Sequence, residues 1–272
     1  MATPKKKTNW AHEAWQLFLL ALGVLAVHSF IAKPFYIPSA SMLPTMLVGD
    51  QLIVSKFPYG YSYLSPSLPI LPEISGRILG SFPDRGDIVV VKSPVEHADW
   101  IKRVVGLPGD TVQMKGGTLW LNGVAVPKIA RDPAELTVTP NTTCDSVIDA
   151  QYQTTNGAGV AICRYPRFRE TLPNGRSYDV LDLGNLDNDN TPPVVVPEGH
   201  VFLMGDNRDN SQDSRVPVEA GGLGLLPIEN VVGRAEFLTY SVDGSWTLDP
   251  RTWFGAFRSG RAFTSLSAKV GP

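Results

Sequence analysis

The chain has 272 residues, and 43% of them are hydrophobic, which is enough to form at least one sizeable core. Its 25 glycines and 23 prolines favour turns and short strands, so the composition predicts a β-rich protein. The formal net charge is -2 and the basic residues form no long stripe, which argues against a nucleic-acid-binding protein. The two cysteines, Cys144 and Cys163, fit neither a zinc site nor a CxxC redox motif.

An apolar run near the N-terminus is the first strong element. It follows a polar segment, 1–14, that carries lysines at 5–7. Residues 15–32 contain no Asp, Glu, Lys or Arg, and about 18 residues is near the minimum for a membrane-spanning helix. Lysines before the span predict a cytoplasmic N-terminus and place the rest of the chain outside. A cleavable signal peptide is the alternative, but the run is longer than a usual h-region and Pro38 lies in the apparent cleavage site, so we favour an anchor.

A hydroxyl-rich segment, IPSASMLPTMLVGD (37–50), follows the anchor. Ser39 and Ser41 lie between two prolines that exclude a regular helix and restrict the backbone. Because an extended chain advances at most about 3.6 Å per residue, Ser41 lies within about 30 Å of the end of the span. Pro-Ser-x-Ser also occurs in ordinary solvated turns, so this segment alone does not establish a reactive serine.

Two apolar, β-branched runs, 51–57 and 87–94, predict strands. Between them, residues 57–82 are rich in Tyr, Pro, Leu and Ile and nearly free of charge. This segment either covers the core or enters the lipid interface.

A further strand is predicted in HADWIKRVVGLPGD (97–110). Alternate residues of a strand share a face, so Lys102 points the same way as Trp100 and Val104. Most strand lysines reach water at an edge. Here the apolar neighbours exclude water from the ammonium, which lowers the pKa of Lys102.

Residues 111–197 predict an inserted, small β-rich second domain. The segment begins as a hairpin with a turn at Asn122-Gly123 and continues as an irregular polar stretch without a titratable cluster suited to catalysis. In an oxidising compartment, a disulfide between Cys144 and Cys163 would close a loop of about 20 residues and stabilise it by roughly 3 kcal/mol. Two free thiols are the alternative.

The predicted core resumes at 198–242, where a strand at 201–205 runs into the polar segment DNRDNSQDSR. An EF-hand loop counted from Asp206 would have Ser211 and Pro217 where Gly and Glu are required, so this is not a calcium loop. The tail, 243–272, mixes aromatic residues with arginines, as in an interfacial helix, although packing on its own domain is an equal alternative.

If Ser41 is a nucleophile, it requires a base that is neutral near pH 7. Two of the four histidines lie in the cytoplasmic segment and the span, while His97 and His200 carry no motif but are not excluded. Lowering the pKa of Lys102 from about 10.4 to near 7 corresponds to about 4 kcal/mol, which burial can supply. We therefore predict a dyad of Ser41 and Lys102.

Four segments that follow the anchor in order resemble the signature boxes of bacterial type I signal peptidases: PSASMLPTMLVGD, RGDIVVVKSP, DWIKRVVGLPGD and GDNRDNSQDSR. The resemblance covers the anchor and nearly all of the predicted core, but not the insertion or the tail. Some members of this family have two spans before the serine, whereas one is predicted here.

The resemblance implies a membrane-bound serine endopeptidase that removes signal peptides after small residues, at A-x-A sites, and uses no metal or other cofactor. The implied fold is an all-β, mostly antiparallel catalytic domain, and the implied location is the bacterial inner membrane with that domain on the periplasmic side. Implied partners are signal peptides of secretory preproteins, membrane lipids and the translocation machinery, with no nucleic acid. The predicted organisation is a cytoplasmic segment 1–14, an anchor 15–32, a catalytic core in two parts 33–110 and 198–242, an insertion 111–197, and a tail 243–272.

The resemblance also implies residue roles. Ser41 is the nucleophile, Lys102 the general base, Ser39 an oxyanion-hole hydroxyl acting with the Ser41 N–H, and Ser211 the residue that orients the lysine. The implied loop-bracing residues are Asp206, Arg208, Asp213 and Arg215, and the implied lining of the substrate cleft is Phe35, Ile37, Met42, Met46 and Ile101.

Two other functions fit parts of the sequence. One is a self-processing Ser-Lys protease, which the anchor and the lack of a DNA-binding domain oppose. The other is an inactive, membrane-tethered protein that binds signal peptides, which the joint presence of Ser41, Lys102 and Ser211 opposes.

Overall fold

A computed structural model describes residues 9–68, 71–96, 98–144 and 149–270. His97, one of the two histidines that the sequence did not exclude, therefore lies outside the described residues.

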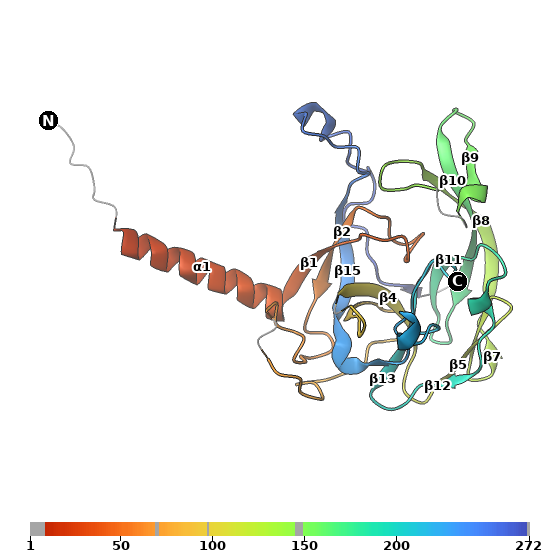
Figure 1. Cartoon of the computed structure of the whole chain (residues 1–272), viewed down its shortest axis with the longest axis horizontal. Coiled ribbons are helices and arrows are strands. Elements are labelled where there is room, and N and C mark those ends of the chain that lie inside the picture. The colour runs from red at the N-terminus through yellow and green to blue at the C-terminus, as the bar shows by residue number, and fades with distance from the viewer. Residues whose placement is uncertain (1–8, 69–70, 97, 145–148, 271–272) are drawn as a thin grey trace.

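A long helix, α1 (Trp10–Phe30), extends away from a β-rich body (Figure 1). It begins at Asn9, whose side chain accepts a hydrogen bond from the backbone amide of His12, and only Ser29 of the helix is buried. The helix starts before the predicted Trp15 and ends before Ala32, which already belongs to β1 (Ala32–Tyr36). This exposed helix has 21 residues, most of them apolar, and is long and apolar enough to cross a membrane.

The central sheet has seven strands in the order β1-β2-β15-β3-β4-β13-β14. Its neighbouring strands pair antiparallel throughout. Strands from before and after the predicted insertion lie side by side, so the two predicted parts of the core form one sheet. Besides β1, the strands are β2 (Asp50–Ser55), β3 (Ile88–Lys92), β4 (Asp99–Gly106), β13 (His200–Met204), β14 (Leu226–Pro227) and β15 (Val231–Ser241).

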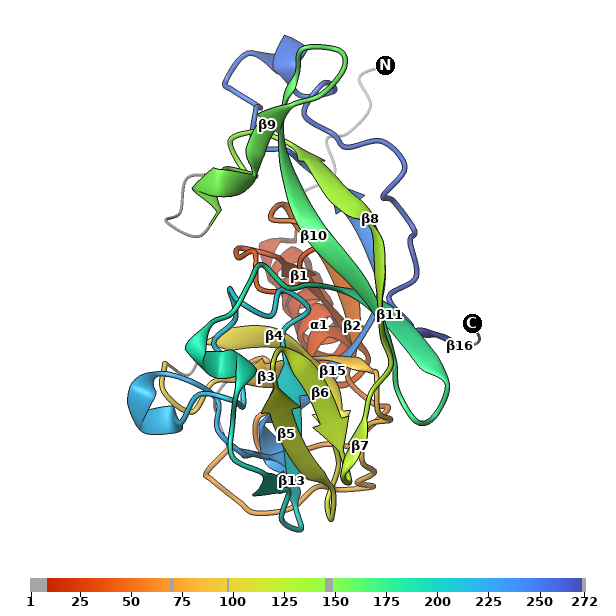
Figure 2. The same ribbon diagram turned by 90° about the vertical axis from the view of Figure 1, so that its right-hand side faces the viewer.

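Two smaller antiparallel sheets form from the segment between β4 and β13, with one strand added from the tail. Figure 2 shows the long ribbon of β8 and β10 along one side of the body. The predicted turn at Asn122-Gly123 joins β6 to β7 with positive φ at both residues. One sheet contains β5 (Thr111–Lys115), β6 (Thr118–Leu121), β7 (Val124–Ala125) and β12 (Val194–Val195); the other contains β8 (Lys128–Thr137), β9 (Gln153–Thr155), β10 (Ala161–Thr171), β11 (Arg176–Leu181) and β16 (Lys269–Val270).

The segment 111–197 shares its cores with the central sheet. Met114 packs in one buried cluster with Phe202 and Met204 of β13. In a second cluster, Leu43 packs with the two cysteines, which form a disulfide. These shared contacts fix the insertion against the body.

Over its described residues, 243–270, the tail does not form the interfacial helix that was one of its two predicted forms. Its last strand pairs with β11, and Arg261 forms an ion pair with Asp50 beside the Ser41 loop. Residues 246–254 instead project from the top of the body in Figure 1, with Trp253 50% and Phe254 88% exposed. The tail thus packs on its own domain through its last strand and Arg261, while several of its aromatic side chains, in this loop and at Phe257 and Phe263, stay exposed.

A buried ion pair joins the insertion to the polar segment after β13. The Arg208 guanidinium donates to both carboxylate oxygens of Glu170 at 2.6 and 2.5 Å, and both side chains are almost completely buried. Tyr178 adds a hydrogen bond to the same carboxylate at 3.1 Å. Glu170 lies outside the four sequence motifs and was not among the predicted site residues.

We predict that Glu170→Ala lowers the free energy of unfolding by about 3–5 kcal/mol, because it leaves the Arg208 charge buried without a partner. Urea unfolding followed by tryptophan fluorescence measures this change. The matched control is Glu135→Ala, which removes an exposed ion pair with Arg164 in the same sheet and should change stability by less than about 1 kcal/mol. Equal effects of the two substitutions would contradict the prediction.

Candidate active site

The loop between β1 and β2 presents Ser41. Its ends are closed by hydrogen bonds from the Ile37 amide to the Asp50 carbonyl and from the Gly49 amide to the Ile37 carbonyl, at 2.9 and 3.0 Å. Met42 and Met46 are fully buried beneath the loop, which anchors it to the core of the central sheet. The serine is therefore held on a fixed turn.

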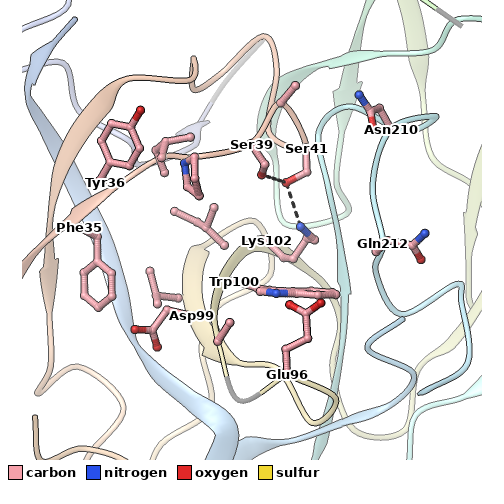
Figure 3. Close-up of a pocket in the computed structure, with 16 residues that line it drawn as sticks. Phe35, Tyr36, Ser39, Ser41, Glu96, Asp99, Trp100, Lys102, Asn210 and Gln212 are labelled. Atoms are coloured by element: carbon pink, nitrogen blue, oxygen red, sulfur yellow. Dashed lines mark hydrogen bonds between the residues drawn. The ribbon is translucent and has the colours of Figure 1, made fainter. Parts of the chain in front are cut away.

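Lys102 comes from β4, an inner strand of the central sheet. Its Nζ lies 2.9 Å from Ser41 Oγ, and Ser39 Oγ lies 3.4 Å from the same oxygen (Figure 3). Trp100 lies on the same face, with its ring centre 5.5 Å from the ammonium. The alternation of side chains along the strand thus directs Lys102 toward Ser41. The side chain of Lys102 is only 4% exposed.

Burial lowers the pKa of Lys102 from 10.5 to about 8, although the carboxylates of Asp213 and Asp206 oppose this change. A substantial fraction of the amine is consequently neutral near pH 8. A neutral amine in hydrogen-bond reach of a serine hydroxyl is suited to accept its proton.

The four predicted bracing residues lie together behind the dyad and form buried ion pairs. Arg103 donates to Asp206 at 2.8 and 2.6 Å. Arg215 binds Asp213, whose carboxylate also accepts the Gly205 amide at 3.0 Å. Burial alone would raise the pKa of Asp213, but the charge and hydrogen bonds of Arg215 hold it below its ordinary value.

Ser211 lies beside the serine loop, and its hydroxyl does not hydrogen-bond to Lys102 in this structure, so its role in orienting the lysine stays a prediction. Its buried hydroxyl has no hydrogen-bond partner within the described part of the chain. A Cβ atom at Gly205 would overlap both this hydroxyl and the Ser41 carbonyl, so a glycine is needed for the close approach. In this structure, Lys102 is instead positioned by its strand and by Ser41.

A pocket of about 430 Å³ opens at the dyad. Phe35, Ile37 and Ile101 line it, as predicted, whereas Met42 and Met46 do not. These two methionines point into the core, where they pack with the side chains of β2. The pocket also has lining residues that the sequence analysis did not assign to it, including Tyr36, Val90, Glu96, Asp99, Trp100, Asn210 and Gln212.

His200, the other candidate base, and a group of three carboxylates lie outside the pocket. His200 starts β13, its ring bonds the Glu198 carbonyl at 3.0 Å, and it does not line the pocket. Among the described residues, one group of three carboxylates comes within 4.8 Å, formed by Asp182, Asp189 and Asp209. It also lies outside the pocket, and the absence of a metal or cofactor remains a prediction.

Comparison with known proteins shows the family. Residues 8–240 match the model described as signal peptidase, peptidase S26. The chain belongs to this family. It is therefore a serine peptidase of the signal peptidase I type, and the predicted fold of antiparallel sheets behind one apolar helix is confirmed.

Two relatives from Rickettsia agree with this assignment. The signal peptidase I of Rickettsia conorii is 34% identical over 289 residues, which cover 98% of each chain. That of Rickettsia bellii is 32% identical and covers 97% of this chain and 89% of its own. A solved signal peptidase I from Enterococcus faecalis covers 57% of this chain and 97% of its own at 25% identity, with a TM-score of 0.29.

We predict that kcat/KM for peptide cleavage rises through a pKa of about 8 and then levels off, because a general base acts only when neutral and burial lowers the pKa of Lys102 to that value. Initial rates between about pH 6 and pH 10, at constant ionic strength, measure the profile. Circular dichroism at each pH is the control for unfolding. A single rise near the ordinary lysine pKa, or near that of histidine, would contradict the assignment.

Proposed function

We propose that this protein is a membrane-anchored endopeptidase that cuts signal peptides from exported preproteins with Ser41 as nucleophile and Lys102 as general base. The hydrogen bond of 2.9 Å between Lys102 Nζ and Ser41 Oγ, inside a pocket, carries the proposal. It provides a nucleophile and a base of lowered pKa in direct contact.

The reaction follows from this contact. Neutral Lys102 accepts the Ser41 proton as Oγ attacks the carbonyl carbon of the scissile peptide bond. The lysine then protonates the leaving nitrogen, the C–N bond breaks, and the signal peptide remains as an ester on Ser41. Water that loses a proton to Lys102 attacks this ester. The ester C–O bond breaks as Lys102 returns that proton to Ser41 Oγ, and the signal peptide leaves as a carboxylic acid that loses its own proton to solvent.

The developing oxyanion requires donors at the serine turn. We assign them to the Ser39 hydroxyl and the Ser41 backbone N–H. The supporting observation is that Ser39 Oγ lies 3.4 Å from Ser41 Oγ, on the same turn. A hydroxyl here can rotate toward the oxygen that forms as Ser41 attacks.

Selectivity for small residues at A-x-A sites fits the walls of the pocket. Ile37 and Ile101 are both buried and line the pocket that contains Ser41 and Lys102. Branched side chains this close to Ser41 leave little depth for a large residue at the cleaved position.

Placement at the outer face of the inner membrane, with a cytoplasmic N-terminus, follows from the anchor and the lysines before it. Residues 61–68 and 71–78 lie against the end of α1, where the Tyr61 hydroxyl donates to the Phe30 carbonyl at 2.8 Å. Ile78 and Leu79 are 73% and 86% exposed, which supports contact of this segment with lipid. Such a position would bring Ser41 to substrates that emerge from the translocation machinery.

The test is cleavage of a purified preprotein with an A-x-A site in detergent. We predict that wild type cuts after the final small residue, whereas Ser41→Ala and Lys102→Met lose activity by at least about a thousandfold, because each removes one member of the dyad. Mass spectrometry of the products locates the cut.

The control is Lys115→Met, which removes an exposed lysine of β5 and should retain the wild-type rate. If all four proteins cut equally, another residue performs the reaction. If none cuts but all bind the signal peptide, the protein is the inactive binder.

We also predict that Ser39→Ala lowers kcat by about a hundredfold with little change in KM, because one oxyanion donor contributes on the order of 3 kcal/mol to the transition state. Steady-state kinetics on the same preprotein separate the two constants. Ser39→Thr keeps the hydroxyl and should recover most of the rate. A full rate in Ser39→Ala would remove Ser39 from the mechanism.

A further inference from the structure

A second pocket, of about 830 Å³, lies next to the pocket of the dyad, and Asp99 lines both. Lys33, Lys56 and Lys92 line the second pocket. The pocket lies where the chain leaves the anchor, because the Lys56 amide donates to the Ile31 carbonyl at 2.9 Å and Lys33 belongs to the strand that follows α1. For an anchored protein, this is the level of the lipid headgroups.

Lys56 carries a buried charge without a counterion. Its side chain is 2% exposed, and within the described part of the chain it forms no ion pair and donates no side-chain hydrogen bond. Lys92 is already paired with Asp99 at 2.8 Å. The Lys33 ammonium lies over the Phe35 ring, 5.0 Å from the ring centre. Two lysines of this pocket thus remain without a carboxylate.

The acids on the same pocket are engaged elsewhere. Glu73 accepts a hydrogen bond from the Tyr63 hydroxyl at 3.4 Å, and Glu229 accepts one from the Gly76 amide at 2.7 Å. Burial, followed by the charge of Lys33, lowers the pKa of Lys56 from 10.5 to about 8, and the opposing effect of Asp99 is smaller. An uncompensated buried ammonium is costly, and an anion in the pocket would offset that cost.

The pocket continues into an apolar groove of about 590 Å³. Leu22, Leu25 and Phe30 of α1 form one wall of the groove. Tyr63, Leu71 and Ile74 line both the groove and the lysine pocket. A ligand that fills both spaces needs a negatively charged head and an apolar chain.

We propose that this lysine pocket binds the phosphate of an anionic phospholipid whose acyl chain lies in the groove along α1. The proposal rests on the proposed membrane anchoring, but it concerns residues outside the dyad. Phosphate chemistry fits a pocket lined by two lysines whose charges interact, and the adjoining groove favours a lipid over a free phosphate.

The experiment is native mass spectrometry of the full chain in detergent with phosphatidylglycerol or phosphatidylcholine added. It uses Ser41→Ala as the background, so that lipid binding is measured independently of peptidase activity. We expect phosphatidylglycerol to bind at least about tenfold more tightly than phosphatidylcholine, and Lys33→Gln with Lys56→Met to remove this preference. Lys115→Gln, an exposed lysine on β5, should leave it unchanged.

Thermal unfolding of each variant controls for misfolding. If the double variant does not fold, Lys33→Gln alone provides the test, and we expect it to lower the preference for phosphatidylglycerol by at least about threefold. Equal binding of the two lipids, or an unchanged preference in the lysine variants, would overturn the proposal. Displacement of the lipid by inorganic phosphate at similar concentrations would show a free-phosphate site, and displacement by a synthetic signal peptide would show a substrate site. Either result would also overturn it.

Discussion

The burial of one lysine beside one serine is the constraint on which the site depends. Lys102 lies on an inner strand of the central sheet, paired with Val89 of β3, so its amine has little water around it. That environment penalises the charged form and leaves a neutral amine in contact with Ser41. Lowering the pKa from 10.5 to about 8 corresponds to roughly 3 kcal/mol of unfavourable interaction with the protonated lysine, which the rest of the fold has to offset.

Buried ion pairs hold the surrounding loop so that the lysine keeps this environment. Arg103 pairs with Asp206, and Arg215 pairs with Asp213. The two carboxylates raise the pKa of Lys102, while burial and the charge of Arg215 lower it. The pair with Glu170 extends the network into the insertion. Such pairs add directional hydrogen bonds, which fix geometry more strictly than apolar contacts do.

The sequence was sufficient to predict the antiparallel core and the approach of Lys102 to Ser41, because strand alternation and the ordered motifs are local properties of the chain. It was not sufficient to predict which way the loop side chains point. Met42 and Met46 lie close to Ser41 in sequence, yet the turn directs them into the core. Glu170 was missed because its partner Arg208 lies far along the chain. The residues next to Glu170 in the sequence do not indicate which arginine it pairs with.

The ion pair between Arg261 and Asp50 has a consequence for the order of events during synthesis. Asp50 closes the loop that presents Ser41, since its carboxylate also accepts the Leu47 amide at 2.8 Å. The partner of this carboxylate is made more than two hundred residues later, at a sequence separation of 211. A nascent chain that already contains Ser41 and Lys102 therefore lacks a support of the Ser41 turn, and we expect full peptidase activity only after the tail has folded back onto the body.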